Sequence, residues 1–268
     1  MRIVHSRTDL IADSGDARRG VVMTMGALHE GHASLIRAAR DMDDHVTVTI
    51  FVNPTQFAAG EDLDKYPRTM DADLALCEAL GVNTVFMPTP DDVYVRPSLV
   101  TVDPGELGTQ LEGAARPTHF RGVLTVVNKL LHLTRPDDAF FGEKDYQQLT
   151  LIRSMVIDLD LGVKVFGVPT AREPDGLAMS SRNVYLTDEQ RVQARAIPRA
   201  LEAGAAEHRP AAIAAAAAAE LADLDVDYIE VRDPELGPAR MGRGRLLVAA
   251  RLGSTRLIDN CAVEVTAL

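Results

Sequence analysis

Two histidines at a strand-to-helix turn are the residues of this sequence best suited to chemistry. His29 and His32 follow Gly26 and precede the apolar spacing that resumes at Leu35, within VVMTMGALHEGHASLI at residues 21–36. Glycine lets the backbone approach a ligand closely, and the N–H groups at a helix start attract anions. Imidazoles can donate to phosphate oxygens. The turn therefore predicts a phosphate-binding site.

Two familiar motifs resemble this turn, and neither fits it. The zinc-binding pattern needs histidines at positions i and i+4 of one helical face, whereas His29 and His32 stand at i and i+3. The P-loop needs lysine and then serine or threonine where this chain has His32 and Ala33. We predict neither a zinc site nor a Walker-type site. A purely structural role for the histidines near a helix start remains the alternative.

Composition and charge narrow the class of protein. The chain has 268 residues, 46% of them hydrophobic, and a formal net charge of −11. A negative balance argues against non-specific binding to nucleic acid or to a membrane surface. We find neither a leader-like apolar segment nor a stretch near the roughly 20 apolar residues that span a bilayer, so we expect a cytoplasmic protein. The distant Cys77 and Cys261 suggest reduced, packed thiols.

Short apolar runs alternate with helical patterns, which is typical of parallel βαβ units. We expect an α/β fold with a doubly wound, Rossmann-like parallel sheet over residues 1–170, followed by a smaller C-terminal α+β domain over 171–268. The strands expected in the sheet are Val21–Met25, Val46–Val52, Thr84–Met87, Ala139–Phe141 and Val163–Val168.

Helical segments separate these runs. By composition GVLTVVNKLLHL and YQQLTLIRSMVI could each be strand or helix, but their length favours helix. DADLALCEALG ends on Gly81 as a helix does. In the C-terminal part, AAIAAAAAAELA predicts a helix, while DYIEVRD, GRLLVAARLG and TRLIDNCAVEV predict strands.

In an open parallel sheet, ligands bind beyond the carboxyl ends of the strands. The turns that follow the expected strands are therefore the candidate site. Four of them are unusual in composition: MGALHEGH, NPTQF, GEKDYQQ and PTAREPDGLAMSSRN.

Taken together, these turns resemble the HxGH nucleotidyl transferases and, within that group, the pantoate–β-alanine ligase family. The matching segments are TMGALHEGHASLIRAAR, IFVNPTQFAAGEDLDKYPRT, RPTHFRGVLTVVNKLL, FFGEKDYQQLTLIR and DGLAMSSRNVYL, in order from residue 24 to residue 186. The C-terminal GRLLVAARLGSTRLIDN is also similar to that family.

The resemblance implies ATP-dependent ligation of (R)-pantoate and β-alanine to pantothenate through a pantoyl-adenylate, with release of AMP and pyrophosphate. The partners are then small molecules, with ATP as a substrate and Mg²⁺ arriving with it. No nucleic acid or membrane partner is expected. The resemblance also suggests a homodimer.

The resemblance further assigns roles to residues. His32 takes the acid role with His29 beside it on the phosphates, Lys144 neutralises the α-phosphate, and Arg182 supports the leaving pyrophosphate. The residues expected to contact ATP are Met25, Gly26, Ala27, Leu28, His29, Glu30, Gly31, His32, Gly142, Glu143, Lys144, Asp145, Ala171, Met179, Ser180, Ser181 and Arg182. The last four belong to a segment that looks like the family's counterpart of the mobile phosphate-binding loop in HIGH-type adenylating enzymes. An ordinary exposed linker at the domain boundary is the alternative for this segment. Gln56, Gln148 and Asn53 are the expected substrate contacts, with Gln56 and Gln148 at pantoate and Gln56 also at β-alanine. Asp73 is the carried-over metal ligand.

The chain departs from the family pattern at a few positions. Met23 stands where proline is usual, and the acidic cluster is thinned to Asp71, Ala72 and Asp73. Ala171 replaces a larger aliphatic residue expected against the adenine. Two other functions stay open: an HxGH nucleotidyl transferase that acts on a phosphate ester, and a nucleotide sensor without catalysis.

Overall fold

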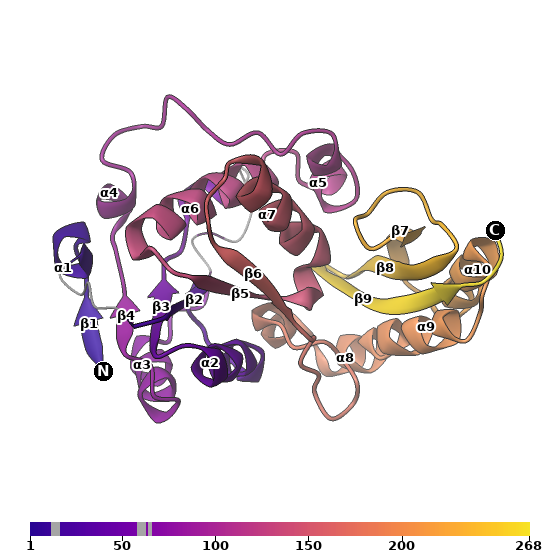
Figure 1. Cartoon of the computed structure of the whole chain (residues 1–268). Helices are drawn as coiled ribbons and strands as arrows, with labels where there is room; N and C mark the ends of the chain where they lie inside the picture. Colours follow the sequence, from indigo (N-terminus) through magenta and orange to yellow (C-terminus); the bar gives the residue numbers. More distant parts are fainter. Residues whose placement is uncertain (12–16, 58–62, 64–65) are drawn as a thin grey trace. The chain divides into compact units, whose positions relative to one another are not determined.

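The computed structural model describes residues 1–11, 17–57, 63 and 66–268, and the chain divides into two compact units. Unit 1 comprises Met1–Glu143 and Leu151–Pro169, and unit 2 comprises Lys144–Thr150 and Thr170–Leu268. Each unit has its own sheet (Figure 1).

The sheet of unit 1 has six strands in the order β1-β4-β3-β2-β5-β6, and every neighbouring pair is parallel. The strands are β1 (Arg2–Val4), β2 (Arg19–Thr24), β3 (His45–Ile50), β4 (Thr84–Phe86), β5 (Asp138–Gly142) and β6 (Lys164–Val168). The chain winds outward from β2 through β3 and β4, and then resumes on the other side of β2 with β5. The winding therefore reverses between β2 and β5, where doubly wound folds bind ligands beyond the strand ends.

Helices pack on both faces of this sheet (Figure 1). The helices and 3₁₀ turns are α1 (Arg7–Ile11), α2 (Glu30–Met42), η1 (Pro54–Gln56), α3 (Met70–Ala79), α4 (Pro90–Val93), η2 (Leu107–Thr109), α5 (Glu112–Ala115), α6 (His119–Thr134) and η3 (Glu143–Asp145). Leu35 and Ile36 of α2 and Cys77 of α3 share one apolar cluster with Val22 and Val48 of the strands. This cluster fixes the helix that begins at the histidine turn.

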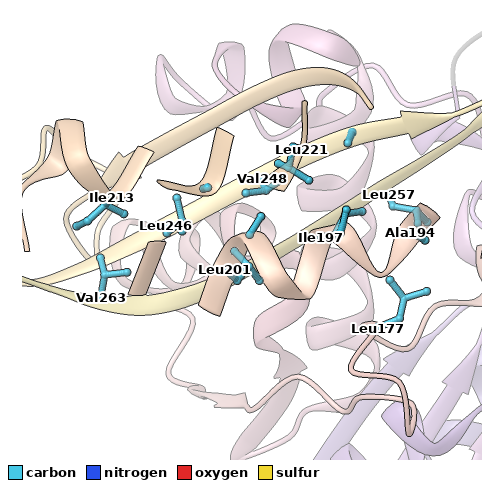
Figure 2. Close-up of a cluster of buried hydrophobic side chains, with 14 of the residues drawn as sticks. Leu177, Ala194, Ile197, Leu201, Ile213, Leu221, Leu246, Val248, Leu257 and Val263 are labelled. Carbon is cyan, nitrogen blue, oxygen red and sulfur yellow. The ribbon is translucent and has the colours of Figure 1, made fainter. Parts of the chain in front are cut away.

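Unit 2 is built on an antiparallel sheet with the order β7-β8-β9. Its elements are η4 (Ser181–Tyr185), α8 (Asp188–Ala194), α9 (Ala196–Ala205), α10 (Pro210–Glu220), β7 (Asp225–Arg232), β8 (Gly242–Leu252) and β9 (Thr255–Val265). Figure 2 shows the core of this unit, where Leu246 and Val248 of β8 lie among Ile197, Leu201 and Ile213 of the helices. The alanine-rich segment forms α10, as predicted.

The predicted fold class is confirmed, and the five expected strands of the parallel sheet agree with β2 to β6 within one or two residues at each end. Both ambiguous segments are helices, α6 and α7 (Tyr146–Asp158). Gly81 follows α3 with a φ of +72°, the conformation expected after a helix end. The sequence gives no strand signal at β1, because only one of its three residues is buried, whereas the equally short β4 is buried throughout.

The division into units differs from the predicted domain boundary in one segment. Lys144–Thr150 belongs to unit 2 rather than to the first domain. The side chain of Asn260 in β9 donates to the carbonyl of Lys144 at 2.9 Å, and Tyr146 donates to the carbonyl of Pro234 at 3.0 Å. Contacts between residues far apart in sequence thus attach this segment to the C-terminal sheet.

Candidate active site

The histidine turn begins where β2 ends, and its backbone is held in a sparsely populated conformation. Gly26 has a φ of +84° and Ala27 a φ of +51°. Glycine adopts such angles without cost, whereas alanine does so only when its surroundings impose them. The hydroxyl of Thr24 accepts from the Gly26 N–H at 3.2 Å and donates to the carbonyl of Thr49 at 2.8 Å. The end of β2 is therefore tied to β3 just before the turn.

Asp73 of α3 supplies the main support for this turn. Its carboxylate accepts from the N–H of Ala27 at 2.9 Å, from the N–H of Leu28 at 2.8 Å and from the hydroxyl of Thr69 at 2.9 Å. Only 2% of Asp73 is exposed. A buried carboxylate that already accepts three hydrogen bonds has little capacity for a metal ion, so the geometry favours a positioning role over the predicted metal ligand. The described residues contain no group of three or more metal-binding side chains.

The two histidines cap α2 reciprocally. Nδ1 of His29 accepts from the N–H of Gly31 at 3.1 Å, and Nδ1 of His32 accepts from the N–H of His29 at 3.3 Å. The ring centroids are 4.2 Å apart. Because each Nδ1 faces a backbone donor, each neutral ring carries its proton on Nε2. The cap thus fixes the tautomer in which Nε2–H is the donor, and the predicted structural and phosphate-binding roles are compatible.

Glu30, the first residue of α2, is exposed and forms an ion pair with Arg37. The hydrogen bond from Arg37 holds the pKa of Glu30 below its usual value. A neighbouring guanidinium therefore partly offsets this negative charge at the helix start.

The NPTQ turn follows β3 and is built around Asn53, which is 1% exposed. Asn53 Nδ2 donates to Gln56 Oε1 at 3.1 Å and to the carbonyl of Gly122 at 3.3 Å. Asn53 Oδ1 accepts from the N–H and the hydroxyl of Thr55 and from the hydroxyl of Tyr94. These contacts occupy the amide, so the geometry favours support of the turn over direct contact with substrate.

Gln56 is the last residue of the NPTQ turn, and its side chain reaches Met25 beside the histidine turn. Its Nε2 is 3.1 Å from Met25 Sδ, and its backbone carbonyl oxygen lies 3.1 Å from His119 Nδ1. A Cβ atom on Gly122 of α6 would lie 2.6 Å from Gln56 Cα, so only glycine allows α6 to pack this closely. Met25, Gly26–His32, Asn53, Gln56 and Asp73 are thus assembled within unit 1.

The second set of predicted residues belongs to unit 2, except that Gly142 ends β5 and Glu143 begins η3 in unit 1. Lys144 Nζ lies 3.6 Å from Asp145 Oδ2. Asn260 fixes the Lys144 carbonyl and accepts at 2.6 Å from Nε of Arg245, whose guanidinium lies 4.0 Å from the centre of the Tyr146 ring. The backbone of the predicted catalytic lysine is therefore anchored by a buried polar network. Gln148 lies in the first turn of α7 and is half-buried.

The Ser-Ser-Arg segment is shaped by hydrogen bonds within unit 2. Ser180 caps η4 by accepting from the N–H of Arg182 at 3.2 Å, and the N–H of Met179 donates to the carbonyl of Ala171 at 2.9 Å. Ala171, Met179, Ser180, Ser181 and Arg182 therefore lie on one looped segment, as the predicted ATP contacts of this region require.

An ion-pair network supports this loop from behind. Arg191 of α8 donates to both carboxylate oxygens of Glu173 and of Asp175, at 2.8–3.1 Å. Asn183 of η4 donates to Glu173 Oε1 at 2.7 Å. The hydrogen bond from Arg191 holds the pKa of Glu173 below its usual value, so the carboxylate stays charged at neutral pH.

The profile of the family described as Pantoate-beta-alanine ligase matches residues 2–262. The chain belongs to this family. It is similar to "Pantothenate synthetase 4" of Frankia alni, with 59% identity over 266 residues that cover 94% of this chain and 87% of that protein. The pantothenate synthetase of Mycolicibacterium vanbaalenii is 60% identical over 252 residues, which cover 91% of this chain and 81% of that protein.

Solved structures agree with this assignment. The ligase superposes on the pantothenate synthetase of Thermus thermophilus with a TM-score of 0.94 and 42% identity, over 100% of both chains. A pantoate–β-alanine ligase from Francisella tularensis, crystallised with "Beta-gamma ATP and Beta-alanine", gives a TM-score of 0.84 and 35% identity over 97% of both chains. The described helices of this ligase include none long and apolar enough to cross a membrane.

Several residues that shape the site of this ligase were not predicted from the sequence. Tyr94, His119 and Gly122 support the NPTQ turn, while Asn260 and Arg245 support the Lys144 segment. The resemblance to the family covers four of these residues, because His119 and Gly122 lie in RPTHFRG, and Arg245 and Asn260 lie in GRLLVAARLGSTRLIDN. Tyr94 lies outside every segment that resembles the family, and the sequence alone indicates no chemistry there.

Proposed function

We propose that this ligase condenses pantoate with β-alanine at the expense of ATP, through a pantoyl-adenylate, to give pantothenate, AMP and pyrophosphate. The observation that carries the proposal is the histidine turn, where two imidazoles with protons on Nε2 stand at the start of α2. Family membership supports the substrates, since the profile covers residues 2–262.

In the first step, a carboxylate oxygen of pantoate attacks the α-phosphorus of ATP, and the bond from that phosphorus to the bridging oxygen of pyrophosphate breaks. Donors are what this step needs, because negative charge builds on the phosphoryl oxygens and on the departing pyrophosphate. We assign His29 and His32 to the phosphates, Lys144 to the α-phosphate, and Ser180, Ser181 and Arg182 to pyrophosphate.

In the second step, the amine of β-alanine attacks the acyl carbon of the adenylate. The bond from that carbon to the bridging oxygen breaks, AMP leaves with this oxygen, and the nitrogen loses its extra proton. Gln56 and Gln148 are proposed to hold pantoate, and Gln56 is also proposed to contact β-alanine. Amides can bind its hydroxyls and carboxylate without trapping the acid in an ion pair.

The cysteines support activation of the acyl group on the nucleotide rather than on the protein. Burial raises the pKa of Cys77 and that of Cys261 to about 11. Thiols with such pKa values are protonated at neutral pH and are poor nucleophiles. The structure therefore offers no support for a cysteine thioester intermediate among its described residues.

Magnesium is proposed to enter with ATP, coordinated by phosphate oxygens and water. Asp73 does not fit as its protein ligand, since this carboxylate is buried and bonded to Ala27, Leu28 and Thr69. We also propose a homodimer in the cytoplasm. Light scattering coupled to size-exclusion chromatography tests the dimer.

Isotope exchange tests the reaction. Enzyme, Mg-ATP and pantoate without β-alanine should exchange labelled pyrophosphate into ATP, and adding β-alanine should release AMP. With oxygen-18 in the pantoate carboxylate, AMP must carry one labelled oxygen. Formation of ADP and phosphate would refute the adenylate. Pyrophosphate exchange that requires a phosphate ester in place of pantoate would favour an HxGH nucleotidyl transferase acting on that ester. Binding of ATP without any exchange would favour a nucleotide sensor.

A further inference from the structure

Asn53 belongs to a buried network that includes a tyrosine from outside the predicted site. The hydroxyl of Tyr94 donates to Asn53 Oδ1 at 2.8 Å, the shortest hydrogen bond described for this amide. Tyr94 follows α4, whereas Asn53 follows β3, so the contact joins two segments that are 41 residues apart in the chain. The hydroxyls of Tyr94 and Thr55 also lie 3.1 Å apart.

The partners of Asn53 fix which way its amide faces. The N–H of Thr55 can only donate and the carbonyl of Gly122 can only accept, and they meet Oδ1 and Nδ2 of Asn53 at 3.3 Å each. Reversing the amide would oppose donor to donor and acceptor to acceptor. Nδ2 therefore faces Gln56.

This orientation passes on to Gln56. Asn53 Nδ2 is a donor, so the Gln56 atom that it meets at 3.1 Å must be the acceptor Oε1. The Gln56 NH₂ group then faces the other way, toward Met25 of the histidine turn, where Nε2 lies 3.1 Å from Sδ. Gln56 thus presents donors rather than its carbonyl on the side of the histidine turn.

The ring of Tyr94 is itself held in place. It packs at a tilt against Phe51, with ring centroids 6.3 Å apart, and Lys129 Nζ lies 5.5 Å from its centre. Burial raises the pKa of Tyr94 above its usual value, so the phenol stays protonated and able to donate throughout the neutral range.

We propose that Tyr94 is a positioning residue which, through Asn53, holds the Gln56 amide with its NH₂ group toward the substrate. Gln56 then selects an acceptor oxygen, such as the carboxylate or a hydroxyl of pantoate, and not the ammonium of β-alanine. This inference rests on the proposed function, which gives Gln56 a place at pantoate.

Tyr94→Phe tests the inference, because it removes the hydroxyl and keeps the ring on Phe51. The lost hydrogen bond should weaken pantoate binding about 3- to 10-fold, measured as Kd by calorimetry and as KM in turnover. The kcat and the KM for ATP should stay within about 2-fold. In a Gln56→Ala background the same substitution should have no further effect on pantoate, because the group through which Tyr94 acts is gone. Tyr228→Phe, which removes a phenol from β7 in unit 2, is the matched control and should change neither constant.

Each result bears on a different statement. If Gln56→Ala weakens pantoate binding and Tyr94→Phe does not, the role of Tyr94 is refuted and the proposed function stands. Equal effects of Tyr94→Phe with and without Gln56, or an equal rise in the KM for ATP, would reduce Tyr94 to a structural residue. If the unmodified enzyme forms no pantothenate, the proposed function itself is wrong.

Discussion

Two buried carboxylates near opposite ends of the strands in the parallel sheet of unit 1 differ in their hydrogen bonds. Asp73, near the carboxyl ends, is 2% exposed and accepts three hydrogen bonds from the histidine turn and from Thr69. Asp43, near the amino ends, is 5% exposed, and neither of its oxygens accepts a hydrogen bond from any group in the described ranges.

Asp43 lies instead in a cluster of like charge. Arg18 Nε is 3.4 Å from Asp43 Oδ1, but the same guanidinium pairs more closely, at 2.6 Å, with Asp138. Burial first, and then the charge of Asp138, raises the pKa of Asp43 to about 6. Backbone donors meet the buried carboxylate at Asp73 but not at Asp43, so we expect the first to stabilise the fold and the second to destabilise it. The comparison predicts that substitutions near the carboxyl ends affect activity, while those near the amino ends affect stability alone.

His32→Ala should give the largest effect near the carboxyl ends. Loss of one preorganised donor should slow adenylate formation roughly 10²–10³-fold. The protein should still fold, because α2 retains its buried face of Leu35 and Ile36. Single-turnover rates measure the first claim and thermal unfolding the second. Rates within tenfold of the unmodified enzyme would remove His32 from the chemistry.

Asp73→Ala should affect both activity and stability. It leaves the N–H groups of Ala27 and Leu28 without their acceptor, which should destabilise the fold by about 2–3 kcal/mol and release the unfavourable φ of Ala27. The KM for ATP should rise about tenfold, because the histidine turn is no longer held in the conformation that binds the phosphates. Urea unfolding and steady-state kinetics measure the two effects. If magnesium titration instead shows a much weaker apparent affinity at saturating ATP, the metal-ligand role would be restored.

Local sequence patterns predicted the strands and the histidine turn. The hydrogen-bond partners of the polar side chains at the site come from residues far away in the sequence, which local patterns do not reveal. The apolar runs predicted β2 to β6, and the glycine-framed histidines predicted the turn that caps α2. The resemblance to the family assigns Asp73 to metal and Asn53 to substrate. The type of a side chain does not reveal how many hydrogen-bond partners it already has, so the sequence could not indicate that both groups are occupied. Asn53 depends on Tyr94, which is 41 residues away, and such pairs are set by tertiary packing.

Gly20→Ala tests the amino ends. A Cβ atom at this buried position in β2 would lie 2.9 Å from Asp43 Cγ, so either the strand or the carboxylate must shift. Overpacking of this kind should lower the free energy of unfolding by about 1–3 kcal/mol. The kcat and all KM values should be unchanged at a temperature where the variant is folded. A reduced kcat would show that the two ends of the sheet are coupled.

Asp43→Asn should give the smallest effect, and this effect should be an increase in the free energy of unfolding. Since the pKa of Asp43 is higher in the folded state than its ordinary value of 3.8, the native protein binds this proton more tightly, and stability from this group falls as pH rises from about 4 to about 6. Above that window the asparagine variant, which carries no charge beside Asp138, should be more stable by about 1–2 kcal/mol. Near pH 4 the two proteins should be alike.

The charged neighbours Arg18, Asp137 and Asp138 are present in both proteins, so the difference between their unfolding free energies at each pH isolates Asp43. Carboxylates with a lowered pKa in the folded state, such as Glu173, contribute stability that is lost as pH falls. This loss is the same in both proteins, so it cancels from the difference. Urea unfolding at pH 4, 6 and 8 measures it. A variant that is less stable at pH 8 would mean that the pairing of Asp43 with Arg18 outweighs its burial beside Asp138, and the contrast between the two ends of the sheet would then fail.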